Sequence, residues 1–92
     1  MKKYLVVISA YPKDELIDAQ SSRMEKAIKG SGMEGLEYVR VGRSLKMIVR
    51  CESLDALIEK MEKIVPRFVD EVLENYEVEI EELGDGEDSE GA

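Results

Sequence analysis

A run of apolar residues near the N-terminus limits the possible folds more than any other part of the chain. Residues 3 to 10 are almost continuously apolar, with Leu5–Ile8 at the centre. Successive side chains of a strand point to opposite faces of its sheet, so a strand made of this segment is covered on both faces and lies centrally. A chain of 92 residues is the size of one small domain. We therefore expect this strand in the middle of a single sheet.

The next segments predict a helix and a β-hairpin. Pro12, Asp14 and Glu15 favour a helix start, because proline suits the first turn and acids suit the positive end of the dipole. Apolar residues then recur at helical spacing as far as Gly30. Residues 36–41 and 45–51 are rich in strand formers, and residues 42–44 are short enough for a turn in which Gly42 takes a positive φ.

A second helix and a last strand follow. Ser53 is a suitable helix cap, and an apolar stripe continues from Leu54 to Val72, with a kink or break expected at Pro66. From Tyr76 to Leu83 apolar residues alternate with glutamates, which is typical of a half-exposed strand.

This order predicts an α+β, ferredoxin-like βαββαβ domain over residues 1–83. Its four-stranded antiparallel sheet has strand order 4-1-3-2, and two helices cover one face. Residues 84–92 contain four acids and three glycines and are expected to form a disordered acidic tail. They account for half of the net charge of −8.

Charge divides the chain unevenly. The segment 39–51 has the bases Arg40, Arg43, Lys46 and Arg50 and no acid, whereas eleven acids and no base follow Arg67. A sheet that is basic at one edge and acidic at the other is self-complementary under two-fold symmetry. We expect the helix-free face, with Ile48 among its charges, to join a second chain and Ile48→Glu to shift the assembly toward monomer.

Composition argues for binding rather than catalysis. The chain has no histidine, which removes imidazole bases and histidine-ligated metals, and its lone Cys51 fits a core position and a reducing cytoplasm. Glutamates on one strand, such as Glu77 and Glu79, are about 6.5–7 Å apart, too far to share an ion. We expect no catalytic residue, cofactor, metal, membrane span or nucleic-acid site. An anion at the basic hairpin is the alternative to a solvated or intersubunit role.

Three segments carry a family resemblance. In order and approximate spacing, the segments 15–20, 35–43 and 74–82 resemble motifs of the PurS subunit of phosphoribosylformylglycinamidine (FGAM) synthase. Ala19 and Ser21 replace the proline and glycine of the first motif, and the segment 64–74 is longer than its counterpart. The resemblance covers about residues 3 to 83 and implies a ferredoxin-like fold.

The resemblance also implies a role. PurS-like proteins form dimers, or dimers of dimers, and bridge the synthetase and glutaminase subunits of an ATP- and glutamine-dependent ligase in purine biosynthesis. Some interface positions are carried over from the family motifs and the others come from the sheet argument. Together they are Asp18, Gln20, Arg40, Gly42, Arg43, Lys46, Ile48, Arg50, Tyr76 and Glu77.

Two other functions use the same elements. The segment 36–73 also resembles the small dimerisation subunit of the KEOPS tRNA-modification complex, which largely lacks the last strand. A ferredoxin-like regulatory dimer that binds a small metabolite is the third possibility, although such modules often place glycine after the first strand, where this chain has Tyr11 and Pro12.

Overall fold

The computed structural model describes residues 1–84 and contains three strands and two helices. The elements follow the order β1 (Lys2–Pro12), α1 (Ala19–Gly30), β2 (Arg43–Cys51), α2 (Leu54–Phe68) and β3 (Glu74–Leu83). The three strands form one antiparallel sheet of order β2-β1-β3. The apolar N-terminal run is the central strand, as its pattern predicts. The tail prediction falls on residues 85–92, outside the described part of the chain.

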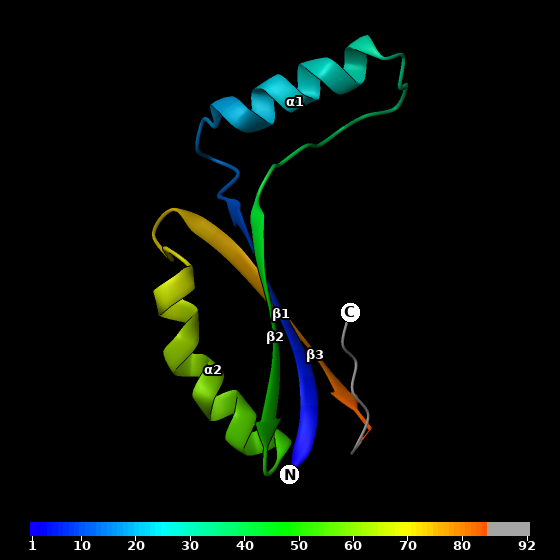
Figure 1. Cartoon of the computed structure of the whole chain (residues 1–92). Helices are drawn as coiled ribbons and strands as arrows, with labels where there is room; N and C mark the ends of the chain where they lie inside the picture. Colours follow the sequence, from blue (N-terminus) through cyan, green and yellow to red (C-terminus); the bar gives the residue numbers. More distant parts are fainter. Residues whose placement is uncertain (85–92) are drawn as a thin grey trace.

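The expected four-stranded ferredoxin-like sheet is wrong, because residues 36–42 form no strand. A hairpin at residues 42–44 requires the chain to reverse, but the glycines at positive φ are Gly32 and Gly35. Gly42 instead lies against the end of β1, where an added Cβ would collide with the carbonyl oxygen of Ala10 and the ring of Tyr11. The segment 36–42 leads into β2 without a turn (Figure 1).

Both helices differ from prediction at their ends. Asp18, not Pro12, precedes the first helix, and its side chain accepts a hydrogen bond from the Ser21 backbone N–H. Pro12 is the last residue of β1. Ser53 caps α2 as expected, but α2 continues through Pro66 and ends at Phe68 without a break there. Pro66 has no N–H to donate to the Glu62 carbonyl, but helical bonding resumes after it, because the Val69 N–H donates to the Val65 carbonyl oxygen at 2.8 Å.

The core lies between α2 and one face of the sheet. Alternate β1 residues from Tyr4 to Ala10 are buried against Leu57, Met61 and Val65, which lie at four-residue spacing on α2. Cys51, at the end of β2, is buried in the same cluster, so its predicted core position is confirmed. Leu54 and Ile58, also part of the predicted stripe, are 46% and 43% exposed.

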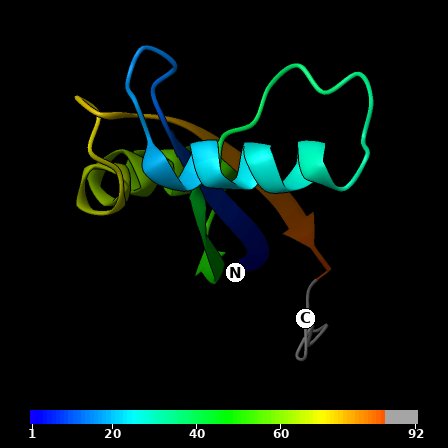
Figure 2. The same ribbon diagram turned by 90° about the horizontal axis from the view of Figure 1, so that it is seen from above.

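The first helix does not cover the sheet, contrary to the prediction. It lies beyond one end of the strands (Figure 1), and Figure 2, looking onto that end, shows α1 across it. We call residues 14–41 the arm. The radius of gyration is 16.9 Å, whereas a compact chain of this length has about 12 Å. No helix of the described residues is long and apolar enough to cross a membrane.

Candidate functional site

The helix-free face of the sheet has three bands of different chemistry. The register places Lys46 and Val7 side by side with Glu79, and Ile48 and Leu5 side by side with Glu81. We call this surface the open face. Its β2 edge is basic, its centre on β1 is apolar, and its β3 edge is acidic. Ile48 is 47% exposed there, although it is a large apolar residue.

Four of the predicted interface residues meet on the open face. Lys46, Ile48 and Arg50 project from β2, and Glu77 projects from β3 opposite Ser9 of β1. Tyr76 projects to the other face, and 42% of it is exposed. The alternation in the sequence was sufficient to place these residues, because a strand fixes which side chains share a face.

A network of hydrogen bonds holds the two chain segments of the arm together. The Arg40 guanidinium donates to the carbonyl oxygens of Asp14 and Leu16, each at 2.8 Å, and its side chain is 12% exposed. The Tyr38 hydroxyl donates to Asp14 Oδ1 at 2.7 Å. This bond to a carboxylate raises the pKa of Tyr38. Arg40 therefore serves the arm itself, in contacts that the family motif did not reveal.

A second part of the arm network is centred on Ser21, the only buried residue of α1. Its hydroxyl donates to Asp18 Oδ2 at 2.6 Å and accepts from the Val41 backbone N–H at 2.9 Å. Two hydrogen bonds from Ser21 lower the pKa of Asp18. The bond from its hydroxyl has the larger effect, and the bond from its backbone N–H has the smaller one. Gln20 is exposed nearby. Sequence reasoning missed Ser21, although Asp18 is a preferred N-cap residue and Ser21 stands at the N3 position whose backbone N–H such a cap accepts from.

Arg43 joins the start of β2 to the end of α2 and the start of β3. It donates to both carboxylate oxygens of Glu74, at 3.2 and 2.9 Å, and to the Phe68 carbonyl oxygen at 2.7 Å. Its guanidinium carbon lies 4.4 Å from the centre of the Phe68 ring. Hydrogen bonds lower the pKa of Glu74. The bond from the Asp70 backbone N–H has the larger effect, and the bonds from Arg43 have a smaller one. No local pattern pairs these residues.

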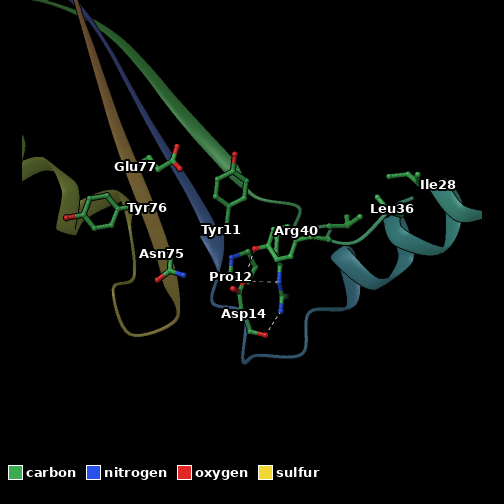
Figure 3. A pocket seen from close by; sticks show the side chains of 11 residues that line it. Tyr11, Pro12, Asp14, Ile28, Leu36, Arg40, Asn75, Tyr76 and Glu77 are labelled. Atoms are coloured by element: carbon green, nitrogen blue, oxygen red, sulfur yellow. Dashed lines mark hydrogen bonds and ion pairs between the residues drawn. The ribbon is translucent and has the colours of Figure 1, made fainter. Parts of the chain in front are cut away.

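A pocket of about 690 Å³ lies where the arm leaves the sheet. Tyr11, Asn75 and Glu77 line it from the sheet, and Leu36 and Arg40 line it from the arm (Figure 3). Arg40 Nη2 donates to the carbonyl oxygens of Asp14 and Leu16. The pocket thus marks the junction between the two parts of the molecule.

Comparisons with known proteins agree on one family. The family described as PurS, phosphoribosylformylglycinamidine (FGAM) synthase, matches residues 5–82. No curated protein sequence matches the chain. Among solved structures, PurS from Thermus thermophilus is 28% identical with a TM-score of 0.77, and the match covers 89% of this chain and 99% of that one.

Two further structures share the fold at lower identity. A chain in the structure of PurLQS from Thermotoga maritima is 23% identical with a TM-score of 0.76, covering 90% of this chain and 100% of that one. PurS from Methanocaldococcus jannaschii, described as a subunit of formylglycinamide ribonucleotide amidotransferase, is 15% identical with a TM-score of 0.71, covering 88% and 99%.

Proposed function

We propose that this chain, which belongs to the PurS family of FGAM synthase, is the non-catalytic assembly subunit that bridges the synthetase and glutaminase of that enzyme. Membership makes it a PurS subunit of FGAM synthase, an enzyme of purine biosynthesis. The proposal adds the bridging role, assembly with further copies of itself and a cytoplasmic location. The chain binds no cofactor of its own under this proposal.

The open face is the observation that carries the proposal. Face-to-face stacking of two copies about a two-fold axis parallel to the strands puts the β2 edge of each over the β3 edge of the other. Lys46 then meets the glutamates of the second copy, and Leu5, Val7 and Ile48 lose their contact with water. An axis across the strands would stack like charges on each other. The charge pattern therefore favours one of the two arrangements.

The comparisons support the choice of partners. The PurLQS structure from Thermotoga maritima contains a chain with the fold of this one, and its description places that chain in an assembly with two other subunits. Neither the KEOPS-type subunit nor the metabolite-binding regulator has comparable support.

The bridging role is tested by reconstitution. The purified chain is mixed with the synthetase and glutaminase from the same source in the presence of glutamine and Mg-ADP, and the mixture is separated by size. We expect the three proteins to elute as one complex, and we expect the two larger proteins to separate when this chain is left out. Separate elution of all three proteins contradicts the proposal.

The open-face contact is tested with Ile48→Glu. Burying a carboxylate beside the acidic β3 edge of the second copy is unfavourable, so we expect the mass measured by light scattering to fall by about half or more. Leu54→Glu is the matched control, because Leu54 is 46% exposed, close to the 47% of Ile48, but lies on α2. If both variants keep the mass of the unmodified chain, the open face is not an interface.

A further inference from the structure

Two turns adjoin at the end of the sheet from which the arm extends. One turn comprises residues 13–18, between β1 and α1, and the other comprises residues 69–73, between α2 and β3. The Lys13 backbone N–H donates to the Leu73 carbonyl oxygen at 3.0 Å, which joins the turns directly. Figure 1 and Figure 2 both show them side by side. They therefore form one surface, which we call the paired turns.

The paired turns carry three exposed large apolar residues. Ile17 is 98% exposed, Val72 is 77% exposed and Leu73 is 49% exposed. Among the large apolar residues in the described part of the chain, Ile17 is the most exposed. Single apolar residues are common on protein surfaces, but a group of them on one surface is typical of an interaction site.

The first turn is fixed on both sides of Ile17. The Leu16 backbone N–H donates to the Lys13 carbonyl oxygen at 3.0 Å, and the Leu16 carbonyl oxygen accepts from Arg40 at 2.8 Å. Asp18, which directly follows Ile17, caps α1. The arm network thus holds a backbone segment whose central side chain has almost no contact within the chain. Because this segment is already ordered, burying Ile17 against a partner costs little conformational entropy.

The second turn is fixed by Asp70. Its side chain accepts from the Val72 backbone N–H at 3.0 Å, and its carbonyl oxygen accepts from the backbone N–H groups of Leu73 and Glu74 at 3.0 and 2.8 Å. The Asp70 N–H donates to the Glu74 side chain at 2.8 Å. Val72 is therefore exposed on a turn whose own hydrogen bonds fix its backbone, as Ile17 is.

Acidic residues surround the apolar ones. The two turns together contain five acids and one base, Lys13, and the acids Glu15 and Glu71 are exposed. A partner surface with basic side chains around an apolar centre is complementary to this pattern. The whole chain has a net charge of −8, so the pattern favours a basic protein over a second copy.

We propose that the paired turns dock on another subunit of FGAM synthase, in an apolar pocket bordered by basic side chains, with Ile17 and Val72 as the inserted residues. This inference rests on the proposed bridging role and names a surface that performs it. The paired turns lie outside the strands, so this contact and the open-face contact use different residues. One copy can therefore make both contacts at once.

Binding measurements with single variants test the docking. Ile17→Ser and Val72→Ser are titrated separately against the synthetase and the glutaminase, with glutamine and Mg-ADP present. Each variant should bind the same one of the two subunits on the order of tenfold more weakly than the unmodified chain, because both side chains enter one pocket. Met33→Ser is the matched control, because Met33 is 57% exposed but lies in the turn after α1. Variants that bind as tightly as Met33→Ser, or that lose affinity for different subunits, overturn the proposal.

The same titrations separate this inference from the bridging role. Binding by the unmodified chain that survives both substitutions overturns the docking surface alone, whereas an unmodified chain that binds neither subunit overturns the bridging role and the docking surface together. Without the other subunits, Ile17→Ser and Val72→Ser should keep the circular dichroism and the light-scattering mass of the unmodified chain, because both side chains are exposed. A lower mass would mean that a second copy covers the paired turns, which also overturns the proposal.

The basic border of the partner's pocket is tested by salt dependence. A double variant, Glu15→Gln with Glu71→Gln, removes two exposed charges from the paired turns and leaves their apolar residues in place. Added sodium chloride should weaken binding of the unmodified chain and should weaken binding of the double variant less, because fewer charges remain to be screened. Glu59→Gln, at an exposed position of α2, is the control and should respond as the unmodified chain does. An equal response of all three chains contradicts a basic partner surface.

Discussion

The arm and the sheet with α2 are stabilised by different kinds of interaction. All nine buried hydrophobic residues of the core belong to the sheet or α2, except Val69, which directly follows α2. Ser21 is the one buried residue of the arm, and hydrogen bonds hold its two segments together. The burial of many apolar side chains adds up over the whole core, whereas one hydrogen bond contributes on balance only about 1 kcal/mol to the free energy of unfolding. The arm is therefore held less firmly than the sheet and α2.

The largest expected difference between the two regions concerns apolar truncation. Leu57 is fully buried, so Leu57→Ala should lower the free energy of unfolding by about 2–5 kcal/mol. Ile17 of the arm is 98% exposed, and Ile17→Ala should change it by less than about 0.5 kcal/mol. Urea denaturation followed by circular dichroism measures both. A comparable loss for Ile17→Ala would mean that the arm is buried in solution.

A smaller effect is expected at Glu74, beside the core. Replacing it with glutamine weakens its bonds with Arg43 and the Asp70 amide, at a cost of about 1 kcal/mol near neutral pH. The pKa of Glu74 in the folded chain lies below its ordinary value of 4.5. Its contribution is therefore complete above that pH and is lost as the pH falls through the folded-state pKa.

Unfolding of the Glu74→Gln variant and of the unmodified chain, measured at neutral pH and at about pH 3, checks this sign. The difference in stability should shrink in acid. Glu59→Gln, at an exposed position of α2, is the control and should show little difference at either pH. A gap that widens in acid would contradict the lowered pKa.

The smallest effect is expected within the arm, at Ser21. Ser21→Ala removes the acceptor of the Val41 amide and should destabilise the arm locally by about 0.5–1.5 kcal/mol. Hydrogen exchange at Val41 should become faster, while exchange at Leu57 in the core stays unchanged. Ser22→Ala, at an exposed neighbouring position, is the matched control. Equal acceleration at Leu57 would show that the arm and the core unfold as one unit.

The sequence predicted those features that depend on neighbours along the chain. Alternation between Tyr76 and Ile80 identified β3 and its two faces, and Ser53 marked the start of α2. The sequence also predicted the basic and acidic edges of the open face, because register and alternation together fix which residues share a face. Lys46, Ile48 and Arg50 were assigned to this face from the pattern of the sequence, whereas Glu77 was carried over from the family motif. Their contact with a partner remains a prediction.

The features that sequence reasoning missed depend on distant residues. The segment 36–41 has the composition of a strand, but Arg40 and Val41 bond to the loop and helix of the arm rather than to β2. Gly42 is required for its close approach to Ala10, not for a turn. Similarly, nothing near Arg43 indicates a bond with Glu74, which lies 31 positions later.

Composition and periodicity by themselves determined that this is a small α+β chain with a central apolar strand and opposite charges on its outer strands, because those properties arise from residues one to four positions apart. Only the tertiary structure decided that the sheet has three strands and that α1 lies beyond its end. Strand pairing requires backbone partners brought together from far along the chain, and here hydrogen bonds from Ser21 and Arg40 hold residues 36–41 in the arm.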